Sequence, residues 1–162
     1  VATLLEQIPV LIRTLGPGMR EIGLKYQKGW TGENLRSALE LALERDIERG
    51  RTGPGPHRAD LIFRAGNRSA RDSLSRGEMK IVATALIMAQ AQSIAVTGVT
   101  PVLLLDDLAS EFDSTHRANV VRQGLSSGAQ VWITGTSLDQ ELIDRAAEAQ
   151  VFHVEQGTLT SL

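Results

Sequence analysis

Two adjacent carboxylates follow an apolar run in the second half of the chain. Val102 to Leu105 is continuously apolar, and Asp106 and Asp107 come next. Such a run predicts a strand covered on both faces, as in a parallel sheet, and these sheets bind ligands at their carboxyl edge. Because successive strand side chains point opposite ways, we expect the two acids to have different roles: one can hold Mg²⁺, and the other can orient or deprotonate an attacking water. The alternative is an acidic loop in which an aspartate caps the next helix.

A second candidate lies between Leu74 and Lys80, at the start of a helix predicted from about Glu78 to Val96. That helix is apolar nearly all round, which predicts burial. Ser75 and Glu78 have the spacing of a capping box. A helix start with a hydroxyl and Gly77 also offers N–H groups to a phosphate, because glycine permits a close approach to the backbone. From this motif alone, a plain helix cap and a phosphate contact both remain open.

The order of these segments is more specific than either motif. The helix after Lys80 leads to the strand that ends in paired acids, and Leu108–Asp113 follows it. A helix at about Ser114–Ser126 and a strand ending at Thr134 come next. This order resembles the C-terminal half of an ABC-type ATPase head, in which the three segments are the signature motif, the Walker B strand and the D-loop.

Finer features are found in five further segments: Gly55–Leu61, Arg71–Gly77, Asp106–Glu111 with Asp113, Phe152–Gly157, and Trp30 after Gly29. Together these segments resemble one family of these ATPases, the RecF family. Its Walker B pair is Asp-Asp, as at Asp106 and Asp107, whereas transporter ATPases and most SMC proteins have Asp-Glu. The resemblance covers essentially the whole chain and implies an α/β fold, the C-terminal part of an ABC/SMC-like ATPase head (P-loop NTPase fold).

The resemblance implies a role for each matched position. Asp106 would hold Mg²⁺ through a water, and Asp107 would be the catalytic carboxylate. The signature residues would contact the γ-phosphate of ATP bound to the opposite protomer, and the D-loop residues would help to join the two sites of a homodimer. These residues are Ser75, Arg76, Gly77 and Glu78 in the signature, and Ser110 and Asp113 in the D-loop.

The γ-phosphate sensor remains open. ABC ATPases usually place a histidine after the strand that ends here at Thr134, but this chain has Gly135, in agreement with the RecF family. The hydroxyl of Thr134 or Thr136 can serve instead. Either residue can equally cap the helix predicted at Gln140–Ala147.

The chain contains no G-x-x-x-x-G-K-[ST] phosphate-binding loop. Because that loop supplies backbone donors and a lysine to the triphosphate, the chain alone is predicted neither to bind ATP tightly nor to hydrolyse it. Its absence, with a start that lacks Met and resembles mid-helix, is expected of a C-terminal fragment. The resemblance implies that the complete protein uses ATP and Mg²⁺, dimerises, and clamps DNA at single-strand gaps and double-strand junctions. RecR is an implied partner, and RecO is a further candidate.

Glycines and prolines between Arg51 and Pro56 predict a domain boundary. Residues 1–50 are predicted to be part of a helical arm domain, with helices at 1–15 and 34–49 and a strand at 22–26. Residues 51–162 are predicted to be the C-terminal portion of the ATPase head. This portion has further strands at 60–64, 102–105 and 131–133, and a hairpin around Gln156 and Gly157.

Composition excludes several classes of protein. With no cysteine among 162 residues, disulfides and thiolate metal sites are excluded, and the three histidines have no ligand-like spacing. The sequence has no signal peptide and no apolar run of about 18 residues, so we expect a cytoplasmic protein that does not bind membranes.

One segment is locally basic although the net charge is −2. The segment from Arg45 to Arg76 contains eight arginines and four acidic residues. Arg64, Arg68 and Arg71 are candidate contacts to DNA phosphates, and a merely solvated surface is the alternative. His57 and Arg58 match the family without an assigned role, and an arginine hydrogen bond that holds their loop explains them equally well.

Two rival functions are retained. The first is another SMC, Rad50 or RecN-type DNA-repair ATPase, although those need long heptad arms and Gly16-Pro17-Gly18 interrupts the early segment here. The second is a DNA-binding scaffold of the same fold that does not hydrolyse ATP. The presence of Asp106, Asp107, Ser75 and Gly77 argues against the scaffold.

Overall fold

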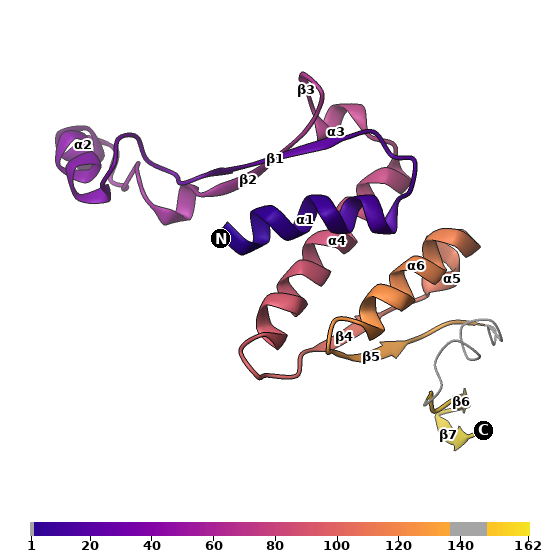
Figure 1. Ribbon diagram of the computed structural model, residues 1–162. Coiled ribbons are helices and arrows are strands. Elements are labelled where there is room, and N and C mark those ends of the chain that lie inside the picture. Colours follow the sequence, from indigo (N-terminus) through magenta and orange to yellow (C-terminus); the bar gives the residue numbers. More distant parts are fainter. Residues whose placement is uncertain (1, 137–148) are drawn as a thin grey trace. The chain divides into compact units, whose positions relative to one another are not determined.

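The computed structural model describes residues 2–136 and 149–162 (Figure 1). The chain forms two compact units, Val1–Ala85 and Leu86–Leu162, and each is described by itself. The helix predicted at Gln140–Ala147 lies outside the described residues. No helix in the described part is long and apolar enough to cross a membrane.

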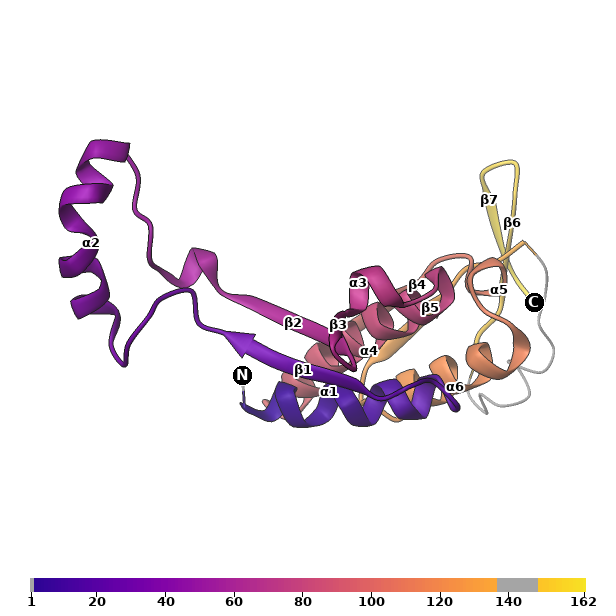
Figure 2. The same ribbon diagram turned by 90° about the horizontal axis from the view of Figure 1, so that it is seen from above.

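The first unit is built around a helix and a long two-stranded ribbon. Helix α1 (Ala2–Leu15) packs on strand β1 (Ile22–Gln27), which pairs antiparallel with β2 (Asp60–Ala65) from Ile22 opposite Ala65 to Gln27 opposite Asp60 (Figure 2). The short β3 (Arg68–Ser69) turns back on β2, and α3 (Ala70–Ser73) follows. One face of α1 is buried, at Ile8, Leu11, Ile12 and Leu15.

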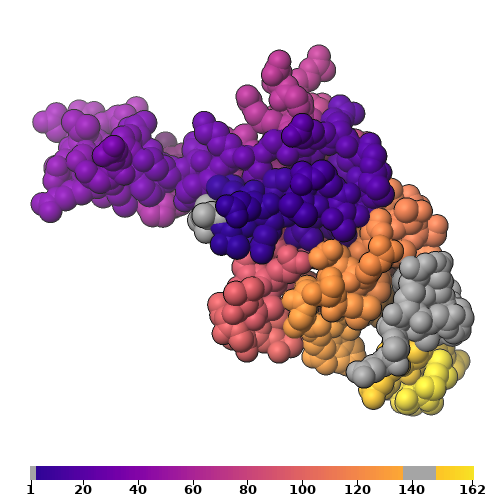
Figure 3. Space-filling model, in the orientation of Figure 1, coloured from indigo at the N-terminus to yellow at the C-terminus, as the bar shows by residue number. Residues whose placement is uncertain are grey.

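Helix α2 (Leu35–Arg49) extends from the end of this ribbon that is remote from β3 (Figure 3). Asn34 begins it by accepting a hydrogen bond from the Ser37 N–H at 2.8 Å, and Gly50 ends it in the left-handed conformation. Ala38 and Ala42 of this helix are buried, whereas Leu43 is exposed.

A backbone hydrogen bond between two glycines joins the segment before α2 to the segment after it. The Gly55 N–H donates to the Gly29 carbonyl at 3.1 Å, and a Cβ on Gly29 would lie 2.3 Å from the Gly55 oxygen. The 3₁₀ turn η1 (Pro56–Arg58) follows immediately and leads into β2. Only glycine fits at position 29, because its φ of +81° is also left-handed.

Helix α4 (Arg76–Ala95) runs from the first unit into the second. Its predicted location is confirmed, but burial on all sides was wrong. Ile81, Val82, Ala85, Met88, Ala89 and Ala91 are buried, whereas Met79, Ile87 and Ile94 are exposed. In the described part of the chain, one side of the helix therefore lacks a covering layer.

The second unit holds the strand that ends in paired acids. Strand β4 (Val102–Leu105) pairs parallel with β5 (Gln130–Ile133), from Val102 opposite Gln130 to Leu105 opposite Ile133. The connection passes through α5 (Leu108–Glu111) and α6 (Ser114–Leu125). Strands β6 (Phe152–Glu155) and β7 (Thr158–Ser161) form the predicted hairpin, whose turn at Gln156 and Gly157 has positive φ at both residues.

Among the described residues, α6 covers one face of the β4–β5 sheet, whereas the other face is largely open and is contacted where Phe152 stacks on Trp132. Leu103 is 5% exposed, and a Cβ on Gly124 of α6 would lie 3.9 Å from it. Leu104, on the opposite face, is 76% exposed, and Trp132 beside it is also exposed. The prediction that β4 is covered on both faces was therefore wrong for this chain by itself.

This asymmetry makes a matched pair of substitutions informative. Leu103→Ala should lower the free energy of unfolding of the chain by about 2–4 kcal/mol, because it leaves a cavity in the core. Leu104→Ala should change it by less than about 0.5 kcal/mol, because the side chain is already in water. Urea unfolding followed by circular dichroism measures both, and equal losses would contradict an open face.

Candidate active site

The carboxyl ends of β4 and β5 meet at one edge of their sheet. The Thr134 N–H donates to the Leu105 carbonyl at 3.0 Å, which extends the pairing one step beyond the strands. The Thr134 hydroxyl donates to Oδ1 of Asp106 at 2.5 Å and accepts from the Asp107 N–H at 3.0 Å. One hydroxyl therefore holds the side chain of the first acid and the backbone of the second.

The two carboxylates have different surroundings. Asp106 is exposed, whereas Asp107 is half-buried and takes a left-handed backbone (φ 45°, ψ 45°). Oδ2 of Asp107 accepts from the Ser110 hydroxyl at 2.5 Å. Oδ1 is buried and has no hydrogen-bond partner within the described residues.

The predicted D-loop, Leu108–Asp113, contains α5 and leads into α6. Asp113 caps α6: its Oδ1 accepts from the His116 N–H at 2.9 Å, and its Oδ2 lies 2.7 Å from His116 Nδ1. The hydrogen bond from the His116 N–H is the main reason that the pKa of Asp113 lies below its ordinary value, and the contact with the His116 ring adds to it. In this chain Asp113 therefore acts as a helix cap, and a role across a dimer stays a prediction.

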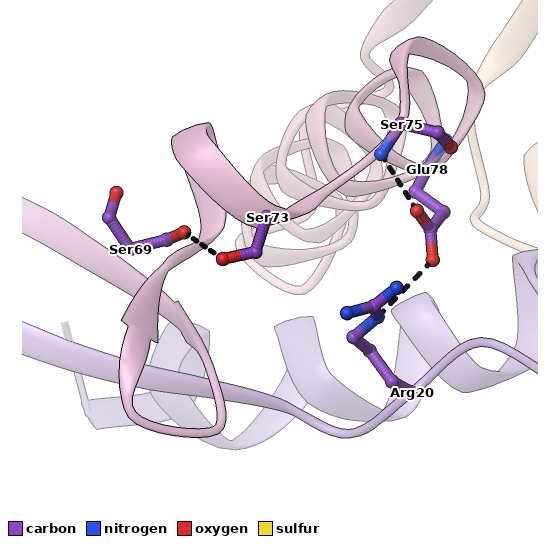
Figure 4. Close-up of polar contacts among 5 residues, drawn as sticks. All are labelled: Arg20, Ser69, Ser73, Ser75 and Glu78. Carbon is purple, nitrogen blue, oxygen red and sulfur yellow. Dashed lines mark hydrogen bonds and ion pairs between the residues drawn. The ribbon is translucent and has the colours of Figure 1, made fainter.

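The predicted signature begins α4 through the expected capping box. The Ser75 N–H donates to Oε2 of Glu78 at 2.8 Å, and the Glu78 N–H donates to the Ser75 hydroxyl oxygen at 3.2 Å (Figure 4). The first of these bonds is the main cause that lowers the pKa of Glu78, with a smaller contribution from Arg20, whose Nε lies 3.6 Å from Oε1. Sequence reasoning missed Arg20, since no local pattern links it to Glu78.

The same geometry leaves the start of α4 accessible. Ser75, Arg76 and Gly77 are exposed, and a Cβ placed on Gly77 would meet nothing within 4 Å. The Ser75 hydroxyl accepts a hydrogen bond, so its own proton is available to an incoming acceptor. A capping box and a contact to a phosphate are thus compatible at this helix start.

Three candidate DNA contacts lie on one short stretch of the first unit. Arg64 is on β2, Arg68 on β3 and Arg71 on α3, and all three are exposed. None of them forms a salt bridge within residues 2–136 and 149–162. Their charges are therefore not neutralised there by a neighbouring acid.

The remaining predicted residues are exposed. His57 and Arg58 are exposed on η1, where the backbone of Arg58 lies against Gly29 and the His57 ring lies against Gly55. Thr136 is exposed, and its role as a sensor stays a prediction.

The carboxylate of Asp106 can supply one oxygen ligand to a hard cation. Asp106 is exposed, and its Oδ2 has no hydrogen-bond partner in the described part of the chain. No group of three acidic or histidine side chains that could hold a metal occurs there either. Mg²⁺ at this edge would therefore rely on Asp106 together with waters and phosphate oxygens, which is its usual coordination in nucleotide sites.

Comparison with solved structures defines the class of protein. The recombination mediator protein RecF-ATPrS of the RecFOR pathway matches with a TM-score of 0.71 at 22% identity, over 99% of this chain and 44% of that one. The SmcHead bound to the C-winged helix domain of ScpA matches with a TM-score of 0.59 at 17% identity, over 99% and 42% of the two chains. The fold is thus that of part of an ABC/SMC-type ATPase head, as predicted.

Sequence comparison identifies the family within this class. The DNA replication and repair protein RecF of Xanthomonas euvesicatoria pv. vesicatoria (strain 85-10) is 40% identical over 158 residues, 96% of this chain and 43% of that protein. RecF of Shewanella halifaxensis (strain HAW-EB4) is 36% identical over 164 residues, 99% of this chain and 44% of that protein. The chain is a relative of the RecF proteins and spans less than half of their length, which is consistent with their C-terminal part. No family model matches it.

The charge of Asp113 makes a pH-dependent prediction. Because its pKa is lowered on folding, its ionised form stabilises the chain above the ordinary value of 3.8, and this stabilisation is lost as the pH falls through the lowered value. Asn also caps helices well, so Asp113→Asn isolates the charge. Thermal unfolding should show the variant less stable than the native chain at neutral pH and equal to it under strong acid.

Asp72→Asn is the matched control for this prediction. Asp72 is also an exposed aspartate near a helix start, but it lies within the first turn of α3 and does not cap the helix. It should leave the unfolding temperature unchanged at both pH values. A difference between Asp113→Asn and the native chain that persists undiminished in acid would contradict the assignment.

Proposed function

We propose that this chain is the part of a DNA-repair ATPase that supplies the Walker B carboxylates, the signature helix and the D-loop. One observation carries the proposal: two carboxylates with different surroundings end a strand at the carboxyl edge of a parallel pair, with Thr134 between them. Asp106 would serve Mg²⁺, and Asp107 would orient or deprotonate the attacking water.

The phosphate-binding loop must come from elsewhere in a complete protein, since this sequence contains none. RecF relatives are more than twice as long as the matched region, so they have room for it. Two of the similar solved structures are of RecF-ATP and RecF-ATPrS, and this likeness supports nucleotide binding by the complete protein. The chain alone is proposed to bind ATP weakly and not to hydrolyse it.

The complete protein is further proposed to dimerise on ATP. Exposed Ser75 and Gly77 at an accessible helix start suit the γ-phosphate of a nucleotide held by a second protomer. Hydrolysis would then open the dimer and release DNA clamped by it. DNA gaps and junctions as substrates, RecR and RecO as partners, and a cytoplasmic location belong to the same proposal.

Replacement of Ser75 tests the dimerisation step. In the complete protein, with the phosphate-binding part restored, Mg-ATP should shift sedimentation from monomer to dimer. Ser75→Arg should abolish the shift, because a long cation fills the space that the phosphate needs. Ser75→Thr, which keeps the hydroxyl and the cap, is the control. If the native protein binds ATP and stays monomeric, the signature segment around Ser75 is only a helix cap.

Asp107→Asn distinguishes an enzyme from a scaffold. An amide cannot accept the proton of an attacking water, so hydrolysis should fall by at least about 10²-fold while ATP binding persists. Steady-state phosphate release and equilibrium nucleotide binding measure the two effects. Unchanged DNA binding together with no measurable hydrolysis by the native protein would instead favour the scaffold.

The arginines predict a salt-dependent contact with DNA. Replacing Arg64, Arg68 and Arg71 by Ala should weaken DNA binding by the complete protein and reduce the slope of log affinity against log salt by about 2–3. The control removes equal charge from exposed Arg13, Arg36 and Arg122 and should leave the slope unchanged. Equal slopes in both triple variants would exclude a local DNA contact.

A further inference from the structure

We propose that two hydroxyls, those of Thr134 and Ser110, make one Walker B carboxylate ready to act and hold the other back. Thr134 holds Asp106 ready for Mg²⁺, and Ser110 holds Asp107 away from the attacking water until the D-loop moves. This inference rests on the proposed ATPase function and adds two positioning residues to it.

The role of Thr134 follows from the direction of its hydrogen bonds. A hydroxyl has one proton, and Thr134 donates it to Asp106 while accepting from the Asp107 N–H. To donate to a γ-phosphate, Thr134 would have to release Asp106. Thr134 is therefore a positioning residue of the Walker B pair rather than the phosphate sensor, and it fixes one Asp106 oxygen so that the other faces solvent.

The role of Ser110 follows from what remains of the Asp107 carboxylate. A general base needs one oxygen that a water can reach. Oδ2 of Asp107 is occupied by the Ser110 hydroxyl, and Oδ1 is buried without a partner in the described part of the chain. In this arrangement Oδ1 is closed to water, and the Ser110 hydroxyl occupies one of the acceptor positions of Oδ2. A buried carboxylate oxygen without a hydrogen-bond donor is unfavourable. This arrangement is therefore a state in which Asp107 is held back from acting as the base.

Movement of the D-loop would release Asp107 from the Ser110 hydroxyl. Ser110 lies within Leu108–Asp113, and its N–H also donates to the Asp107 carbonyl at 3.0 Å. Ser110 itself is exposed, so a second protomer that contacts this loop can draw its hydroxyl from Asp107. Dimerisation would thus free the base where the nucleotide is already held.

The experiment compares Thr134→Val with Ser110→Ala in the complete protein, because the two changes should act in opposite directions. Thr134→Val should raise several-fold the Mg²⁺ concentration that gives half-maximal ATP binding, measured at equilibrium without turnover. It should also slow hydrolysis. Ser110→Ala should leave the Mg²⁺ dependence unchanged and raise several-fold the rate of hydrolysis at protein concentrations that only partly dimerise the native protein, because dimerisation no longer has to break the hydrogen bond from Ser110 to Asp107.

Conservative variants separate positioning from folding. Thr134→Ser and Ser110→Thr keep a hydroxyl and should behave like the native protein. Thermal unfolding of the 162-residue chain shows whether each variant folds, and Thr134→Ala replaces Thr134→Val if the latter does not. An unchanged Mg²⁺ dependence in a folded Thr134 variant would overturn the role of Thr134. A slower or unchanged rate in Ser110→Ala would overturn that of Ser110.

Asp107→Asn distinguishes failure of this inference from failure of the proposed function. If it abolishes hydrolysis and Ser110→Ala does not raise it, the ATPase assignment stands and the restraint by Ser110 is wrong. If Asp107→Asn hydrolyses ATP at the native rate, Asp107 is not the base, and both proposals fall together.

Discussion

Parallel pairing of β4 with β5 is the constraint on which the candidate site depends. Because Leu105 lies opposite Ile133, the residues that follow the two strands meet at one edge, and Thr134 lies between Asp106 and Asp107. A slip of one residue would turn each side chain to the other face of the sheet and separate these groups. Burial of Leu103 alone does not fix this register, since Leu104 could fill the same place, but the hydrogen bonds of Thr134 with Leu105, Asp106 and Asp107 depend on it.

Local chemistry explains which parts of the site were predictable from sequence. The capping box of Ser75 and Glu78 joins residues three apart, and the paired acids directly follow an apolar run. Contacts between distant segments were not predictable: Arg20 reaches Glu78, and Thr134 reaches Asp106 across the sheet. The left-handed backbone of Asp107 also carried no signal, because aspartate adopts it less often than glycine does.

The two wrong burial predictions share one physical reason. Apolar patterns record the environment of a segment in the whole protein, and here both patterns exceed the burial that the chain itself provides. Leu104 on β4 and Ile87 on α4 are apolar yet exposed, and similar RecF proteins are more than twice as long. An apolar pattern with an open face is therefore consistent with a larger ATPase head, and it complements the absence of a phosphate-binding loop.

The central claim is that one active site combines Asp107 of one protomer with Ser75 of the other. Mixing two inactive complete proteins, Asp107→Asn and Ser75→Arg, tests it directly by steady-state phosphate release. Ser75→Arg does not dimerise with itself, whereas a mixed dimer contains one site with both native residues, so phosphate release by the mixture should rise well above that of either protein alone. No recovery, although the two proteins form mixed dimers, would contradict a site shared between protomers.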